Sequence, residues 1–249
     1  MPKVKLKQAV ADCLVKGFPG LTKGEREELQ QLGLVLHYGP DELIAQEGSF
    51  CAGVYLVCQG LVAIGKYAPT SQDKRVLRFL APGEWYGLEP FFLEREPVNI
   101  QFMRTIVEST LLFFQNSQFQ SFLGHHPQAL WDLCRWLSRE VAMLEFKLTR
   151  ETTESSDRNF ALLLLALANK YGQALQNGDT IRLDIPFTRQ TMAELLGVSL
   201  ETLMRLLRRF RERGLIRTHR SHLEILSKKR LKEVARTSEF YLTILEETL

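Results

Sequence analysis

The segment Phe187–Phe210 of this 249-residue chain reads FTRQTMAELLGVSLETLMRLLRRF. Thr188 and Ser199 are residue types that cap helix N-termini, and Gly197 between them permits a sharp turn. The segment therefore predicts two short helices that share a core across a tight turn, which is a helix-turn-helix. The core positions, which recur at helical spacing, are Met192, Leu195 and Leu196 in the first helix and Leu203, Leu206, Leu207 and Phe210 in the second.

The second of these helices lies in a basic part of the chain. From Arg182 to Lys232 there are 13 Lys and Arg against 5 Asp and Glu, a net charge of +8, whereas residues 1–181 carry a net −2. A basic block bounded by neutral or acidic segments indicates a nucleic-acid-binding module. In a helix-turn-helix the second helix enters the major groove, so we expect double-stranded DNA as a partner.

Several side chains on the solvent side of the second helix suit contacts with DNA. The hydroxyls of Ser199 and Thr202 lie near the helix N-terminus and suit a phosphate oxygen. Glu201 suits the amino group of a cytosine, and Arg205, one turn later, suits a bidentate pair with guanine. The alternative for these two residues is a surface ion pair worth about 0.3–0.5 kcal/mol. Further along the helix, phosphate contacts are expected for Arg208 and Arg209.

A strand pair and a further helix flank this segment. The runs Leu215–Thr218 and Leu223–Leu226 surround the polar turn His219–His222, which predicts a β-hairpin wing. Upstream, a helix is expected over Arg158–Tyr171, and Asn177-Gly178 indicates a hairpin turn. Together these elements predict a winged helix-turn-helix domain.

The N-terminal half of the chain has a different pattern. Short helices are expected at about residues 8–32, with a capping box formed by Thr22 and Glu25. From about residue 34 to 114, short β-like runs such as Val54–Cys58 are separated by Gly, Pro and polar turns. Many short strands at a spacing of about ten residues indicate an antiparallel barrel or sandwich.

After Pro127 the apolar spacing becomes helical. Two stripes on one helix need two partners, and we expect one stripe to pack on the strand domain and the other against the same helix of a second chain. The alternative is an internal helix of a single large domain. The predicted dimerisation seam comprises Leu130, Leu133, Leu137, Val141, Leu144 and Leu148, and the second stripe comprises Ala129, Trp136 and Met143.

Composition excludes several classes of protein. The chain is 45% hydrophobic and 24% charged, as ordinary soluble proteins are, and its longest apolar run, Phe160–Ala168, is too short to span a membrane. No apolar signal core follows the basic N-terminus, so we expect a cytoplasmic protein. The sequence has no phosphate loop, metal-ligand set or nucleophile–base pattern, so we expect neither an enzyme nor a bound metal or cofactor.

The four cysteines, Cys13, Cys51, Cys58 and Cys134, show no C-x-x-C spacing. In a cytosolic chain disulfides are rare, so reduced, packed thiols are expected. The alternative is a redox-sensing pair formed by Cys51 and Cys58.

The helix-turn-helix is similar to that of the cyclic-AMP receptor protein and fumarate–nitrate reduction regulator (Crp/Fnr) family. The similarity runs from Phe187-Thr188-Arg189-Gln190 through Leu196-Gly197-x-Ser199-x-Glu201-Thr202-x-x-Arg205-Leu206-Leu207 to Gly214-Leu215-Ile216. Earlier in the chain, Gln46-Glu47-Gly48, Gly60 and Leu80-Ala81-Pro82-Gly83-Glu84 with Gly87 resemble the β-roll of the family's effector domain. The helix from Pro127 resembles the family's dimerisation helix.

This resemblance implies roles for individual residues. Glu201 and Arg205 match the family's base-reading pair, and His219 matches a backbone contact in the wing. Leu200 departs from cyclic-AMP-type members, which carry arginine there, so the outer base pair of the half-site stays open. RNA polymerase is implied as a partner. The remaining positions expected at the DNA surface are Thr188, Arg189, Gln190, Ser199 and Thr202, the last four as phosphate contacts.

The resemblance also indicates where an effector would bind. Cyclic-nucleotide-binding members carry a Gly-Glu pair and, about ten residues later, an arginine that neutralises the cyclic phosphate. Here Leu88 follows Gly87, and the arginine position falls on Val98 or Asn99. A buried phosphate without its cation is costly, so cyclic AMP is not expected. The expected pocket comprises Tyr86, Gly87, Leu88, Glu89, Val98 and Asn99, with an unidentified small molecule or no effector.

The sequence thus predicts an α+β protein with an antiparallel β-roll, similar to the cyclic-nucleotide-binding jelly roll, a long dimerisation helix and a C-terminal winged helix-turn-helix. The expected domains are residues 1–126, 127–154 and 155–230, followed by a helical extension over 231–249. The expected function is that of a homodimeric transcription regulator that binds a palindromic DNA site. The alternatives are a cyclic-nucleotide-, haem- or redox-responsive member of the same family, or a ligand-binding regulator that acts on a protein partner.

Overall fold

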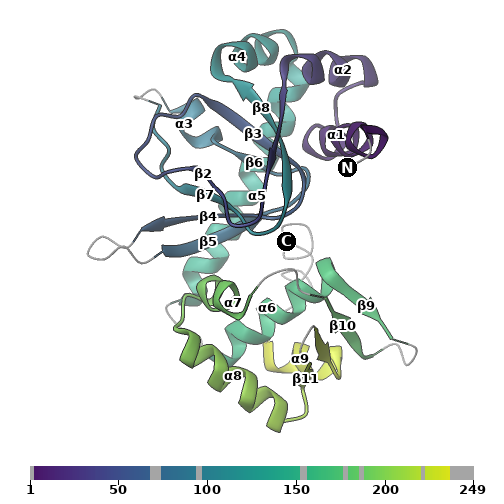
Figure 1. Cartoon of the computed structure of the whole chain (residues 1–249), viewed down its shortest axis with the longest axis vertical. Helices are drawn as coiled ribbons and strands as arrows, with labels where there is room; N and C mark the ends of the chain where they lie inside the picture. The colour runs from purple at the N-terminus through teal and green to yellow at the C-terminus, as the bar shows by residue number, and fades with distance from the viewer. Residues whose placement is uncertain are drawn as a thin grey trace. The chain divides into compact units, whose positions relative to one another are not determined.

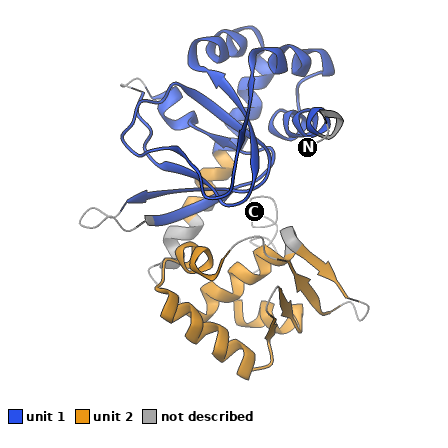
Figure 2. Ribbon diagram, in the orientation of Figure 1, with its two compact units in different colours: residues 1–137 blue, residues 138–249 orange. Residues whose placement is uncertain are grey.

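A computed structural model of the chain describes residues 3–67, 74–93, 97–151, 156–175, 179–184, 188–219 and 222–235. The chain divides into two compact units, residues 1–137 and residues 138–249 (Figure 2). The division falls inside the long helix α5 (Pro127–Glu151), whereas the sequence placed domain boundaries at its two ends. The difference arises because the first turns of α5 belong to the core of the first unit.

Two antiparallel sheets form the first unit (Figure 1). In one sheet the strand order is β1-β8-β3-β6, and in the other it is β2-β7-β4-β5. Every strand pair in both sheets is antiparallel, so the predicted antiparallel strand domain is confirmed. The strands are β1 (Leu34–Tyr38), β2 (Leu43–Ala45), β3 (Gly53–Gln59), β4 (Val62–Tyr67), β5 (Lys74–Leu80), β6 (Trp85–Tyr86), β7 (Phe102–Thr105) and β8 (Ser109–Gln115).

Four helices accompany these sheets, namely α1 (Lys3–Gly17), α2 (Lys23–Leu32), α3 (Leu88–Phe92) and α4 (Asn116–His125). The first of them begins earlier than the expected residue 8. The predicted capping box of α2 is confirmed, since the Thr22 amide donates to Glu25 Oε2 over 2.7 Å and the Glu25 amide donates to Thr22 Oγ1 over 3.3 Å. Helices α1, α4 and α5 share a core with strand β3, in which Phe18, Trp85 and Phe119 are fully buried.

The apolar residues of helix α5 divide between buried and exposed positions differently from the prediction. Ala129, Leu133 and Trp136 are buried against the first unit, and Leu137 packs beside them. The assignment of Leu133 to a seam facing a second chain is therefore wrong, because its own unit buries it. The exposed apolar side chains of the helix are Leu130, Trp131, Val141 and Leu144, while the side chains of Met143 and Leu148 lie outside the described residues.

A disulfide joins Cys13 of α1 to Cys58 of β3. The expectation of reduced thiols is wrong for this pair, and the alternative pairing of Cys51 with Cys58 is also wrong, since Cys51 is a buried free thiol. Helix α1 packs on β3 and brings two residues 45 positions apart to a Cα–Cα distance of 4.8 Å. Nothing in the spacing of the cysteines signals this contact.

The second unit is a small sheet surrounded by helices (Figure 1). Its elements after α5 are α6 (Ser156–Tyr171), β9 (Gly172–Ala174), β10 (Ile181–Leu183), α7 (Arg189–Leu196), α8 (Leu200–Glu212), β11 (Ile216–Thr218), β12 (Leu223–Ile225) and α9 (Lys228–Ala235). The strand order is β11-β12-β10-β9, and β9 pairs antiparallel with β10 on either side of the expected hairpin turn. That turn, at Asn177-Gly178, lies outside the described residues.

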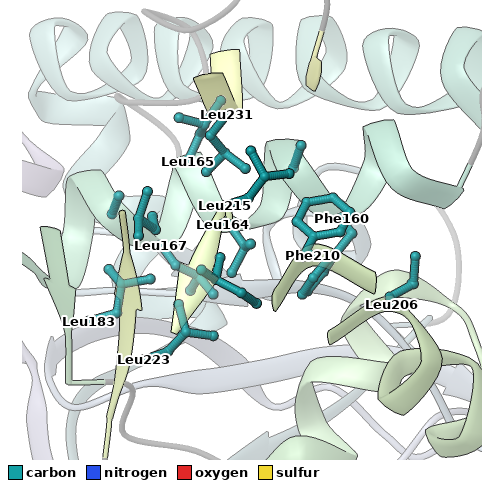
Figure 3. Close-up of a cluster of buried hydrophobic side chains, with 14 of the residues drawn as sticks. Phe160, Leu164, Leu165, Leu167, Leu183, Leu206, Phe210, Leu215, Leu223 and Leu231 are labelled. Carbon is teal, nitrogen blue, oxygen red and sulfur yellow. The ribbon is translucent and has the colours of Figure 1, made fainter. Parts of the chain in front are cut away.

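The core of the second unit forms between α6, α8 and the small sheet (Figure 3). Phe160 and Phe210 are fully buried and meet edge to face, with ring centroids 4.7 Å apart. Helix α9 completes this core through Leu231 and Ala235. The predicted C-terminal helix thus begins three residues earlier than expected, at Lys228, and packs on the DNA-binding domain; residues 236–249 lie outside the described ones.

Among the described residues, no helix is both long and apolar enough to cross a membrane.

Candidate nucleic-acid interface

Helices α7 and α8 form the predicted helix-turn-helix, and side-chain caps fix where each begins. Thr188 accepts a hydrogen bond from the Thr191 amide over 3.2 Å, and Ser199 accepts one from the Thr202 amide over 3.2 Å. Between the helices, Gly197 adopts a left-handed φ of 65°, a conformation that costs other residues more than glycine. The caps and the glycine thus set the turn that presents the N-terminus of α8. Phe187 lies outside the described residues.

The two faces of α8 differ sharply. Leu203, Leu206, Leu207 and Phe210 are buried, as predicted, and anchor the helix to the core of the second unit. On the other side Leu200 and Met204 are 42% and 50% exposed, and Glu201 and Arg205 are also exposed. The helix is therefore held rigidly by one face while the face that carries the predicted base-reading pair stays accessible.

Arg205 is engaged by the cap of its own helix. Its Nη2 donates to Thr202 Oγ1 over 3.2 Å, and Thr202 Oγ1 lies 3.0 Å from Ser199 Oγ. Within the described residues, Glu201 and Arg205 form no ion pair, so the surface-pair alternative for these two side chains finds no support in the structure. The cap holds the guanidinium near the helix N-terminus, where base edges are read in this motif.

The next two arginines have carboxylate partners. Arg208 Nε donates to Glu212 Oε1 over 2.8 Å, and this hydrogen bond, with the attraction of the Glu212 charge, raises the pKa of Arg208. Arg209 forms an ion pair with Asp157 at the start of α6, and Arg213 Nη1 lies 3.1 Å from Asp157 Oδ2. Sequence reasoning missed this contact because 52 positions separate Arg209 from Asp157. Arg209 thus ties α8 to α6, besides its predicted phosphate contact.

Helix α7 places the remaining predicted contacts around its first turn. Thr188 is the exposed cap, Arg189 is half-buried, and Gln190 is exposed and donates to Glu194 Oε1 over 3.4 Å. Since α7 spans only about two helical turns before Gly197, these side chains and the start of α8 belong to the same two-helix motif.

The predicted wing is present as an antiparallel hairpin. Strand β11 pairs with β12 in the register Ile216–Ile225, Arg217–Glu224 and Thr218–Leu223. The His219 amide donates to the carbonyl of His222 over 2.9 Å and closes the turn, whose residues 220 and 221 lie outside the described ones. His219, the predicted backbone contact, is exposed at the end of β11.

In the first unit, the predicted effector residues divide into two groups. Tyr86 and Asn99 are buried together, and the Tyr86 hydroxyl lies 3.1 Å from Asn99 Oδ1 while donating to the carbonyl of Gln101 over 2.7 Å. Asn99 Nδ2 donates to Ser49 Oγ over 3.0 Å. Burial raises the pKa of Tyr86 well above its usual value, so its hydroxyl stays protonated. Val98, by contrast, is 39% exposed.

Gly87, Leu88 and Glu89 form the start of α3. Leu88 is fully buried, whereas Glu89 is partly buried and its Oε1 lies 3.9 Å from Arg78 Nη2. The Arg78 guanidinium also lies over the Trp136 ring at 5.1 Å, and its burial lowers the pKa of Arg78. Arg78 was missed in the sequence because it occupies an ordinary position in strand β5. It connects α3 of the predicted pocket with α5.

The folds of the two units define the class of the protein. The first unit is an antiparallel β-roll, and the second is a winged helix-turn-helix domain. Sequence models of two domains match the chain: a Crp-like helix-turn-helix domain over residues 160–234 and a cyclic nucleotide-binding domain over residues 35–126. The chain belongs to the Crp/Fnr family of DNA-binding transcription regulators.

Known proteins resemble the chain over most of its length. The transcriptional activatory protein AadR of Rhodopseudomonas palustris is 24% identical over 226 residues, which are 90% of this chain and 91% of that protein. The nitrogen fixation regulation protein FixK of Bradyrhizobium diazoefficiens is 22% identical over 90% of this chain and 93% of its own length. The solved structure of FixK2 from Bradyrhizobium japonicum, at 20% identity, covers 83% of this chain and 98% of its own with a TM-score of 0.69, which supports the fold.

Proposed function

We propose that the protein binds a palindromic DNA site as a homodimer, with α8 of each chain in one major groove. The observation that carries this proposal is the exposed pair Glu201 and Arg205 at the capped start of a helix whose opposite face is buried. Ser199, Thr202 and the α7 residues would contact phosphates, as would the wing through His219. The two half-sites would lie about one helical turn of DNA, or a multiple of it, apart.

The exposed apolar residues of α5 support the dimer. Val141 and Leu144 are 54% and 47% exposed, which is unusual for aliphatic side chains on a helix whose other face is buried. Pairing with α5 of a second chain would cover them. Leu133 of the predicted seam is buried in the core of the first unit. The proposed dimer contact on α5 therefore comprises Leu130, Val141 and Leu144.

The buried network of the β-roll argues against cyclic AMP as the effector. Cyclic-nucleotide binders place a cation at the position that falls on Val98 or Asn99; Val98 carries no charge, and Asn99 contacts the neutral groups of Tyr86, Ser49 and Phe50. A cyclic phosphate beside Asn99 would lack the charge partner that its burial requires. The cyclic-nucleotide-binding family model thus describes the fold of this domain, and the residues around Asn99 do not fit the nucleotide. We propose that the protein acts without a cofactor, with a different small molecule or none as its signal.

The proposed partners are bacterial DNA and, on the family resemblance, RNA polymerase, and the proposed place of action is accordingly the cytoplasm. The test is a binding selection from random duplexes with the full chain, followed by footprinting on the enriched sequence. We expect an inverted repeat with one G·C pair per half-site assigned to Glu201 and Arg205. A selection that enriches no two-fold-symmetric sequence, with or without added cyclic nucleotides, would overturn the proposal.

A further inference from the structure

A second cluster of polar side chains lies on the wing and shares only His219 with the proposed DNA contacts. It consists of His219 at the end of β11 and His222 and Glu224 at and after the start of β12. The two imidazole rings stack nearly in parallel, with centroids 4.1 Å apart and planes 12° apart. The hairpin register places all three residues at one end of the wing.

Their ring nitrogens converge on one carboxylate. His219 Nε2 lies 3.4 Å from Glu224 Oε2, and His222 Nε2 lies 3.5 Å from Glu224 Oε1. Two donors bound at about 2.1 Å to a tetrahedral Zn²⁺ lie about 3.4 Å apart. Both separations match that edge, and the three candidate ligand atoms all lie within 4.8 Å of one another. Because the two rings are stacked nearly in parallel, one imidazole has to turn about its side-chain torsions so that both Nε2 lone pairs point at the same ion.

The chemistry of the donors selects the class of cation. Two imidazole nitrogens and one carboxylate suit Zn²⁺ and its neighbours Ni²⁺ and Cu²⁺, whereas Mg²⁺ and Ca²⁺ prefer oxygen donors. His222 and Glu224 are partly buried, with exposed fractions of 15% and 14% for their side chains, so they are held in place by the hairpin. His219 is 37% exposed and leaves one side of the cluster open to solvent.

Other charged groups face the same carboxylate. Arg217 Nη1 lies 3.1 Å from Glu224 Oε2, and Arg182 of β10 lies opposite Glu224 in the sheet, where it pairs with Asp184. The Arg217 guanidinium and the two imidazoles surround the Glu224 carboxylate, which is the one anionic group of the cluster. The carboxylate is therefore available as an anionic ligand, and Arg217 competes with a cation for it.

We propose that His219, His222 and Glu224 form a binding site for one divalent transition-metal ion of the zinc class on the wing of each chain. Sequence patterns did not predict a metal site, because His219 meets His222 and Glu224 only once the chain turns back on itself in the hairpin. Metal binding at these residues can be measured without DNA, so its outcome is separate from that of the DNA selection.

The test uses untagged full-length protein, stripped with a chelator and dialysed against Zn²⁺, with metal content measured by mass spectrometry and affinity by calorimetry. We expect one Zn²⁺ per chain in the parent, and an affinity at least about tenfold weaker in His219→Gln and His222→Gln. Arg217→Gln should strengthen binding, because it removes the competing cation. Co²⁺ should give visible absorption bands that both histidine variants lose, and Mg²⁺ should not compete.

His126→Gln is the matched control. His126 also lies between two carboxylates, but its Nδ1 faces Glu25 at 3.3 Å and its Nε2 faces Glu28 at 3.3 Å, so opposite ring nitrogens cannot converge on one ion. This variant should retain the parent stoichiometry and affinity. The proposal is overturned if the parent takes up no Zn²⁺, or if the wing variants bind it as tightly as the parent does. Thermal unfolding of each variant verifies that the wing substitutions leave the fold intact.

Discussion

Arg205 differs from Arg208 and Arg209 of the same helix in its hydrogen-bond partner. Its hydrogen bond goes to the neutral hydroxyl of Thr202, whereas Arg208 and Arg209 contact the carboxylates of Glu212 and Asp157. A guanidinium held by a neutral hydroxyl gives up little when it turns to a guanine, while one that leaves a carboxylate must break an ion pair. Of these three arginines, Arg205 is therefore the one best prepared to read a base.

Replacing Arg205 by alanine should weaken binding to the selected DNA site by about 1–3 kcal/mol and relax discrimination at one base pair. Fluorescence anisotropy on the selected duplex and on its single-base variants measures both effects. Arg208→Ala is the control, since loss of a phosphate contact should weaken binding equally on all sequences and reduce the salt dependence. An equal loss on selected and random DNA for Arg205→Ala would remove this residue from base reading.

The disulfide between Cys13 and Cys58 should contribute to the stability of the first unit. It closes a loop across 45 positions, for which the chain-entropy relation gives about 4 kcal/mol. The three tryptophans, Trp85, Trp131 and Trp136, all lie in this unit, so thermal unfolding followed by tryptophan fluorescence reports on it.

We expect dithiothreitol to lower the unfolding temperature of oxidised parent protein and to have no effect on Cys58→Ala, which starts at the lower value. Cys134→Ser, on exposed α5, should behave like the parent. If dithiothreitol lowers the unfolding temperature of the parent and of Cys58→Ala by the same amount, the disulfide is not the source of the stabilisation.

At the scale of the element, α8 depends on its N-cap. The Ser199 hydroxyl satisfies the Thr202 amide and also contacts the hydroxyl that holds Arg205, so one side chain both starts the helix and orders its exposed N-terminal end. Loss of such a cap by substitution with alanine costs about 0.5–2 kcal/mol, whereas glycine at this position costs only a few tenths.

Ser199→Ala and Ser199→Gly separate these two roles. Both remove the hydroxyl and should weaken DNA binding similarly, but only the alanine variant should loosen the first turn of α8. Hydrogen–deuterium exchange of the peptide that begins α8 is the measurement, and we expect faster exchange in the alanine variant. Exchange in the alanine variant as slow as in the parent protein would show that the cap does not stabilise the turn.

At the scale of the whole molecule, the proposed dimer decides whether two α8 helices can read one palindrome. Val141→Glu places a charge on the exposed apolar line of α5 and should convert the dimer to monomer in sedimentation velocity. Affinity for the two-fold site should fall with it, while affinity for a single half-site should not change. A variant that sediments as the parent dimer would exclude this face from the interface.

Arg139→Glu is the control for that variant. Residue 139 is also exposed on α5 but lies about 200° around the helix from residue 141. The Arg139→Glu substitution introduces the same carboxylate on a side of α5 away from Val141 and Leu144, so it should leave the dimer intact.

The elements governed by short-range patterns could be predicted from the sequence. The caps at Thr22, Thr188 and Ser199, the turn at Gly197 and the buried face of α8 all depend on residues within one or two helical turns of each other. The antiparallel strands and the wing follow from alternation and turn residues in the same way. For this reason the sequence alone determined the fold class, the helix-turn-helix and which side chains are exposed on α8.

The tertiary structure alone decided which distant residues meet. The disulfide of Cys13 with Cys58, the ion pair of Arg209 with Asp157 and the burial of Leu133 all depend on packing between elements far apart in the chain. Periodicity shows which face of a helix is apolar, but it does not show which neighbour will cover that face. The physical reason is that a local pattern sets backbone conformation, whereas a long-range contact exists only once the elements have packed.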